Sequence, residues 1–180
     1  NLPGTQLLGN GTGVSVHGPE NVSGGPGKGN TLSGNAYHGL VIYDGAASGT
    51  VVQGNKIGTR PDGVTPAGNV YYGIQTHNAF DNLIGGDDPA EGNVLAHNGF
   101  YGVFVDSGDG NAFLANSIYG NGYWGIDHAP YGVSMNDPAD ADLGPNRGQN
   151  YPVLTSVVAN GGSAQFTGVL SSTPNSEFSI

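Results

Sequence analysis

One short motif places aromatic rings at two fixed positions in successive segments of the chain. The motif is Asn-x-aromatic-(His, Tyr or Trp)-Gly-aliphatic, and it occurs at residues 35–40, 69–74, 98–103 and 121–126 with no change in its internal spacing. If these segments stack, the two ring positions form two columns. Exposed rows of rigid rings suit contact with sugar faces or with another protein. The first aromatic column is Tyr37, Tyr71, Phe100 and Tyr123, and the second aromatic column is His38, Tyr72, Tyr101 and Trp124.

The two columns occupy adjacent positions at a corner, where both rings cannot easily be buried. We expect one column to form an interior stack that stabilises the fold, while the other faces outward. The alternative has both columns half-buried under loops.

Three residues could perform acid–base chemistry. By the two-residue alternation of strands, His77, Asp106 and Asp127 fall at outward positions on adjacent segments, with Asp106 beside His77. Glycoside hydrolases use two carboxyl groups about 5 to 9.5 Å apart. Asp106 with Asp127, or Asp106 with His77, could therefore act as general acid and base. The sequence favours the other interpretation, a solvated strand face with scattered polar residues.

An acidic stretch late in the chain carries oxygen ligands near a turn-forming glycine. Ca²⁺ takes 6–8 oxygen ligands, so this spacing suits a calcium site. Because the full EF-hand spacing with a terminal Glu is missing, an ordinary surface loop in which Asp residues cap turns is favoured, and no cofactor is expected to be required. The candidate ligands are Asp137, Asp140, Asp142 and Asn146.

Composition limits the class of protein and of partner. The 180 residues include 34 Gly, 11 Pro and no Cys, and the net charge is −10 with only 4 Lys and Arg. Nucleic acid is excluded as a partner because it requires clustered basic residues, and polyanionic sugars are disfavoured for the same reason. No apolar run approaches the roughly 20 residues that span a bilayer.

The five histidines lack the paired spacing of a transition-metal site, and His97 and His128 are expected to be structural.

Short strands separated by Gly and Asn turns must position these side chains. A second motif, Asn-x-(Leu or Ile), interleaves with the first and gives each repeat two or three strands. Strands this short gain partners only when equivalent strands stack about 4.8 Å apart. The sequence therefore predicts an all-β parallel β-helix, with amide ladders of motif Asn residues in the turns. Its second-motif copies begin at Asn30, Asn55, Asn82, Asn93 and Asn116.

Alternation also predicts which side chains fill the interior. The inward pairs on successive strands are Val14/Val16, Leu40/Ile42, Ile74/Thr76, Val103/Val105 and Ile126/His128.

The stretch from Gln53-Gly-Asn-Lys-Ile-Gly-Thr through Asn82-Leu-Ile-Gly-Gly to Asn98 resembles the right-handed parallel β-helix repeat proteins, the pectate-lyase-like superfamily in its broad sense. The likeness covers roughly residues 9 to 128 and implies a right-handed helix. It implies no activity, because the family includes lyases, hydrolases, epimerases and adhesins. The Asn-Thr-Asp, Asp-Asp, Gly-His-Gly and Arg-Ile-Lys set of the polygalacturonase-like hydrolases has no counterpart, since the one Asp-Asp pair, Asp87-Asp88, lies in a turn.

The domain organisation follows from these patterns. Residues 1–128 are expected to form four to five coils of β-helix, 129–150 an Asp- and Pro-rich capping loop, and 151–180 a strand extension. Three strands are predicted there, at 151–158, 164–170 and 177–180, with a hairpin-like turn at 160–162. They would pack on the coils, begin a further domain, or pair with a neighbouring molecule.

These observations favour a non-catalytic module at the cell surface or outside the cell. Its expected partners are a second copy of itself, in a filament or surface layer, or a polysaccharide bound by the aromatic columns. The alternatives are a polysaccharide lyase or glycoside hydrolase, and a passive spacer in a longer protein. The chain is also expected to be part of a longer precursor.

Overall fold

The computed structural model describes residues 9–141 and 143–175, and it is nearly all β-structure. Most strands belong to three parallel sheets. The first sheet contains β1 (Val14–Val16), β4 (Leu40–Tyr43), β7 (Ile74–His77), β10 (Val103–Val105) and β13 (Ile126–His128). The second contains β2 (Val22–Gly24), β5 (Val51–Gln53), β8 (Leu83–Gly85) and β11 (Ala112–Leu114). The third contains β3 (Thr31–Leu32), β6 (Lys56–Ile57), β9 (Val94–Ala96) and β12 (Ser117–Tyr119).

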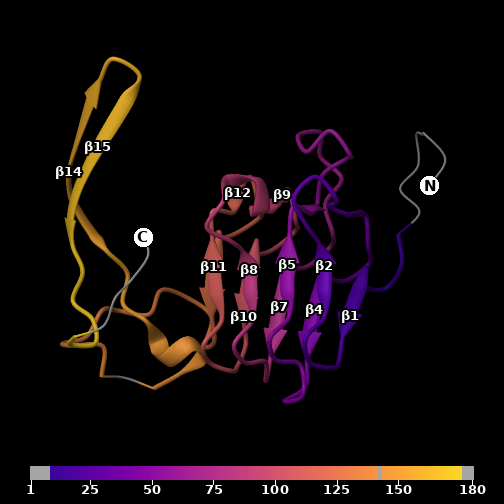
Figure 1. Ribbon diagram of the computed structural model, residues 1–180, viewed down its shortest axis with the longest axis horizontal. Coiled ribbons are helices and arrows are strands. Elements are labelled where there is room, and N and C mark those ends of the chain that lie inside the picture. Colours follow the sequence, from indigo (N-terminus) through magenta and orange to yellow (C-terminus); the bar gives the residue numbers. More distant parts are fainter. Residues whose placement is uncertain (1–8, 142, 176–180) are drawn as a thin grey trace.

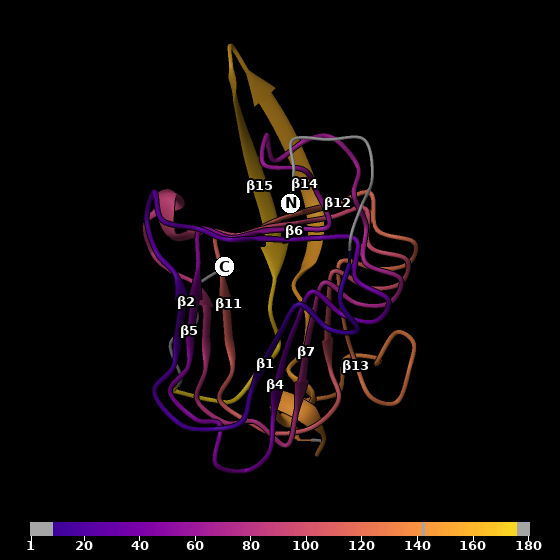
Figure 2. The same ribbon diagram turned by 90° about the vertical axis from the view of Figure 1, so that its right-hand side faces the viewer.

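The chain visits the three sheets in turn and then returns to the first one layer further on. Each circuit forms a coil, and the coils stack side by side along the molecule (Figure 1). Seen along the stack, the sheets form the sides of a prism (Figure 2). This arrangement is compatible with a parallel β-helix. In the described part of the chain, no helix is long and apolar enough to cross a membrane.

Aliphatic side chains fill the prism, as alternation predicts. Leu40, Ile74 and Val103 are paired in register on neighbouring strands, and each is fully buried. The last coil, which contains β13, is less well buried because no further described coil covers it. Ile126, predicted to point inward, is 44% exposed there. The other members of the core include Ile42, Val52, Ile57, Ile84, Leu95 and Val105.

Asparagine side chains connect the coils at three corners. In the first ladder, the Oδ1 atom of each Asn accepts a hydrogen bond from the backbone N of the Asn one coil earlier, and usually a second one from the Nδ2 of that residue. Asn69 Oδ1, for example, accepts from Asn35 N at 3.1 Å and from Asn35 Nδ2 at 2.7 Å. A carbonyl of an adjacent coil commonly accepts a further bond from Nδ2. Four buried or half-buried polar atoms are therefore paired at each step. This first ladder runs through Asn10, Asn35, Asn69, Asn98 and Asn121.

The second motif separates into two ladders rather than one. Asn30, Asn55, Asn93 and Asn116 form the second ladder. Asn82 belongs instead to the third, in which Thr50 N donates to it and it donates to Asn111. Asn82 precedes a strand of the second sheet, whereas the other copies of this motif precede strands of the third.

The glycine of the aromatic motif is required for space between coils. A Cβ on Gly73 would lie 2.5 Å from the carbonyl oxygen of Gly102 and 2.9 Å from Asn98 Nδ2. Such distances are too short for any side chain, so a glycine here lets neighbouring coils approach closely.

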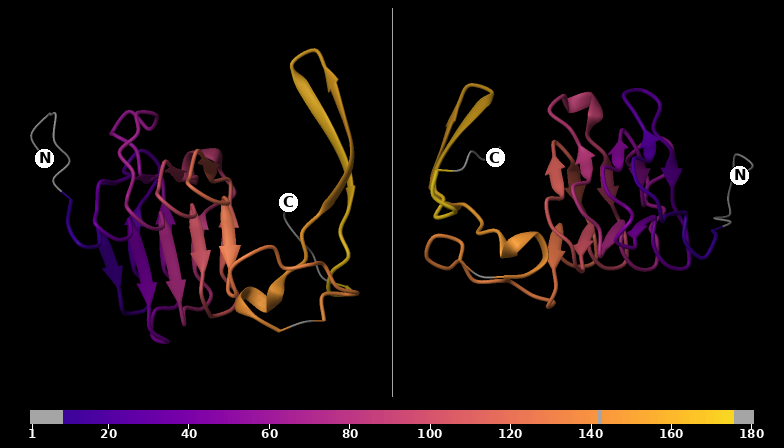
Figure 3. Two further views of the ribbon diagram at one scale, coloured as in Figure 1. Left: turned by 180° about the vertical axis from the view of Figure 1, so that it is seen from behind. Right: turned by 60° about the horizontal axis from the view of Figure 1, so that its bottom comes forward.

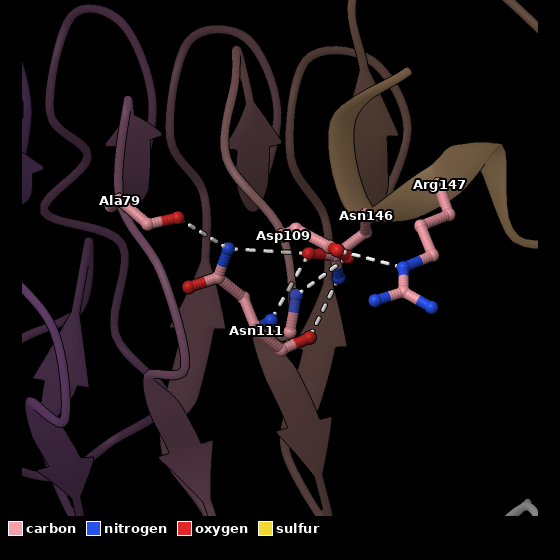
Figure 4. A network of polar contacts seen from close by, with 6 residues as sticks. Ala79, Asp109, Asn111, Asn146 and Arg147 are labelled. Atoms are coloured by element: carbon pink, nitrogen blue, oxygen red, sulfur yellow. Dashed lines mark hydrogen bonds and ion pairs between the residues drawn. The ribbon is translucent and has the colours of Figure 1, made fainter. Parts of the chain in front are cut away.

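Residues of the capping loop end the third ladder. η2 (Pro145–Gly148) places Asn146 so that its Oδ1 accepts from Asn111 N at 3.1 Å and its Nδ2 donates to Asn111 O at 2.6 Å (Figure 4). Arg147 Nε donates to Asp109 Oδ2 at 2.7 Å beside it. The other short turn, η1 (Pro89–Glu91), is capped by Asp88.

The extension contains an antiparallel hairpin of β14 (Val153–Asn160) and β15 (Ser163–Val169). Gly161 and Gly162 form its turn, both with positive φ. Every residue of the two strands is exposed, and the hairpin stands away from the coils (Figure 3). It does not pack on the coils as one alternative supposed. The third predicted strand, 177–180, lies outside the described residues.

We predict that Asn98→Ala lowers the free energy of unfolding by about 3 kcal/mol, because partners in Asn69, Asn121 and Ile57 lose their hydrogen bonds in a buried setting. Urea unfolding measures the change. The control is Asn21→Ala in an exposed turn, and equal losses in the two variants would contradict a stabilising role for the ladder.

We predict that Thr76→Val raises the free energy of unfolding by about 1 kcal/mol. The Thr76 hydroxyl is buried without a hydrogen-bond partner, between Ile42 and Val105 of adjacent strands. Thr31→Val, on an exposed position, is the matched control. A destabilised Thr76→Val would contradict this description of the core.

Candidate functional site

The first aromatic column is a continuous stack on the outside of the molecule. Successive ring centroids, from Tyr37 through Tyr71 and Phe100 to Tyr123, lie 5.9, 5.3 and 5.2 Å apart, with planes within 21° of parallel. Tyr37 and Tyr123, at its ends, are 55% and 60% exposed. Because the inner rings face one another along the stack, they present mainly their edges to solvent. A sugar therefore cannot lie flat on the middle of this column.

The second aromatic column is covered in its middle. Tyr72 and Tyr101 are 7% and 5% exposed, and they pack against Phe104, which points outward from β10 between the inward Val103 and Val105. One column is largely buried and the other faces outward, as expected. The expected interior position is wrong, because the buried rings form a separate cluster on the outer face of the first sheet rather than in the aliphatic core.

The loop after β13 covers this cluster. Tyr131 stacks on Phe104 with centroids 4.8 Å apart, and its hydroxyl lies 2.9 Å from that of Tyr72. Burial, followed by the hydrogen bond with Tyr131, raises the pKa of Tyr72. Burial also raises the pKa of Tyr101, with a smaller contribution from the Asp127 carboxylate. Burial lowers the pKa of His38 at the beginning of the column.

Trp124 ends the second column and has one face available. Its indole stacks on Tyr101 at 5.9 Å and 11°, and no further ring of the described chain continues the column. The side chain is 46% exposed and borders a pocket of about 240 Å³. The pocket is lined by Trp124, Ile126, Asp127, His128, Gly132, Val133, Ser134, Gln149 and Tyr151, which we call the Trp124 pocket.

Polar groups of the Trp124 pocket come from β13 and from the capping loop. Asp127 is 6% exposed, and one of its oxygens accepts from Gly132 N at 3.3 Å. Ser134 Oγ lies 3.5 Å from His128 Nδ1. Gln149 follows η2 and contributes an amide. The pocket thus combines aromatic surface with a carboxylate, an imidazole, a hydroxyl and an amide, a composition typical of small-ligand sites.

The structure brings together two of the three predicted acid–base residues. His77 Nδ1 and Asp106 Oδ2 form a hydrogen bond, and both side chains are partly exposed. Tyr43 stacks on His77 at 4.6 Å, and His17 packs on Tyr43. Asp127 is instead paired in register with Phe104 and buried in the Trp124 pocket.

Most oxygens of the predicted calcium ligands already have partners. Asp137 caps Ala141 N, Asp140 accepts from Asn150 N and Ser172 Oγ, and Asn146 belongs to the third ladder. Asp142 lies outside the described residues. Among the residues that are described, no group of three or more His, Cys, Asp or Glu side chains could hold a metal ion. The calcium site stays a prediction.

Sequence reasoning missed the residues that turn the columns into a pocket. Phe104 stood at a predicted outward position, but Tyr131, Ser134, Gln149 and Tyr151 lie in segments without the repeat. The change from Gly-rich repeats to Pro-rich sequence after Ile126 was the available signal that a different structure begins there.

Comparison with known proteins adds no family. Neither the family models, nor the curated proteins, nor the solved structures gave a match to this chain.

We predict that the folded state loses stability as the pH rises above about 10. Tyr72 and Tyr101 have raised pKa values, so the folded state holds their protons more tightly than the unfolded chain, and this stabilisation is complete only below the unfolded pKa. Urea unfolding between about pH 9 and pH 11 measures the loss. Tyr72→Phe should reduce the slope and Tyr37→Phe should not; equal slopes in all three proteins would contradict the assignment.

Proposed function

We propose that this chain is a non-catalytic saccharide-binding module, and that the Trp124 pocket is its binding site. The fold we assign is a right-handed parallel β-helix like that of the pectate-lyase-like repeat proteins. Connections between parallel strands of one sheet are right-handed in nearly all proteins, which supports this handedness. Such a module belongs at a cell surface or outside the cell, where polysaccharides are found.

The observation that carries the proposal is the free face of Trp124. Inner rings of both columns are stacked on both sides or covered, whereas the indole ends its column and faces the pocket. An indole face offers a flat apolar surface to the C–H groups of a pyranose ring, and a ring fixed by Tyr101 loses little entropy when it binds.

The polar lining supports a ligand rich in hydroxyl groups. Ser134 and Gln149 each offer a donor and an acceptor, and Asp127 offers acceptors. This mixture suits sugar hydroxyls, which both donate and accept. Tyr151, 44% exposed, provides a second ring at the same pocket. A pocket of about 240 Å³ accommodates one or two sugar units rather than a long chain, so we propose recognition of a chain end or a short branch.

A second candidate function is cleavage of a polysaccharide, favoured by the contact between His77 and Asp106. The carboxylate orients the imidazole, whose other nitrogen could act as a base. Asp127, the second carboxylate considered for a hydrolase, is buried and bonded to the loop, which counts against a two-carboxylate mechanism. Release of reducing or unsaturated ends that Asp106→Asn abolishes would establish this function in place of binding alone.

We predict that soluble oligosaccharides change the fluorescence of the intact protein, because Trp124 is its one tryptophan and lies at the site. Oligomers of glucose, mannose and N-acetylglucosamine form the panel. Calorimetry on Trp124→Ala should show at least tenfold weaker binding, whereas Tyr37→Ala, at the opposite end of the columns, should bind as the unmodified protein does. No binding across the panel, or equal loss in both variants, would contradict the proposal.

A further inference from the structure

The basic side chains at the Trp124 pocket are limited to the imidazole of His128. Asp127 contributes a carboxylate, and no Lys or Arg lines the pocket. Arg147, the nearest basic residue along the chain, donates to Asp109 instead. The remaining basic residues, Lys28, Lys56 and Arg60, precede the third coil, far from β13 in sequence, and the chain carries a net charge of −10.

The aromatic rings act in the same direction as the carboxylate. Trp124 and Tyr151 both line the pocket, and the negative face of an aromatic ring attracts a cation, most strongly for Trp. A carboxylate beside an indole face can receive an ammonium group by a charge-assisted hydrogen bond while the sugar ring packs on the indole. An anionic sugar would meet Asp127 with the imidazole of His128 as the one basic side chain among the lining residues.

We propose that the preferred ligand of the Trp124 pocket is an amino sugar with a free ammonium group, such as a deacetylated hexosamine unit, with Asp127 and Trp124 as its recognition pair. This inference rests on the proposed saccharide-binding function and adds the chemical class of the sugar. The aromatic columns alone do not predict this preference for an amino sugar. The preference depends on Asp127, which is paired in register with Phe104 and lines the same pocket as Trp124.

The test compares glucosamine oligomers with N-acetylglucosamine oligomers of equal length, by calorimetry at a pH at which the free amine is protonated. We expect the free-amine oligomer to bind about tenfold more tightly, as one charge-assisted contact implies. Asp127→Asn should remove the preference for the free amine, whereas Asp87→Asn, at an exposed position outside the pocket, should leave the preference unchanged.

Asp127 accepts a hydrogen bond from Gly132 N, so Asp127→Asn could also perturb the loop that contains Gly132. A second variant, with a charge added to the pocket, tests the amino-sugar preference without removing this bond. Gln149→Glu introduces a second carboxylate into the pocket and should increase the preference for the free amine severalfold. Equal binding of both oligomers would overturn the amino-sugar inference and leave saccharide binding intact, while no binding of either would overturn both. Binding of a lysine oligopeptide in preference to either sugar would assign the pocket to a peptide and overturn the inference.

Discussion

The distance between neighbouring coils is the constraint on which the rest of this structure depends. The asparagine ladders hold the coils at this distance. Each ladder step pairs a backbone amide and a side-chain amide with the Oδ1 of the next coil, at a corner where water is excluded. Parallel strand register then carries the same spacing around all three sheets. The motif glycines permit this approach, since a Cβ at Gly73 would collide with the next coil.

The distance between coils also determines which aromatic rings keep a face free for a ligand. Rings repeated at one position of each coil are brought within stacking distance, so they cover one another and stabilise the outside of the corner. Only a ring at the end of a column keeps a free face. Repetition therefore builds a rigid support, and the interruption of the repeat after β13 provides the pocket, because the loop and the chain after η2 supply polar groups that no coil carries.

The repeat made the fold and half of the site predictable from sequence. The interleaved motifs predicted coils of two or three short strands, and local alternation predicted the inward aliphatic positions and the contact of His77 with Asp106. The motif alone did not separate Asn82 from the other copies, because two corners use similar sequences. Tyr131 and Gln149 could not be placed, since loop 129–133 folds back on Phe104 through contacts between residues distant in the chain that no periodicity encodes. For the same reason Asp127, predicted on an open face, is buried.

The central claim is that the free ring face at the end of the column, rather than the column itself, binds sugar. Mapping by NMR the amide and indole signals that shift when a glucosamine oligomer is added tests this most directly. We expect one site per chain, with shifts confined to the Trp124 indole and to residues around Asp127, Gly132 and Gln149. Shifts distributed along Tyr37, Tyr71 and Phe100, with several sites per chain, would contradict it.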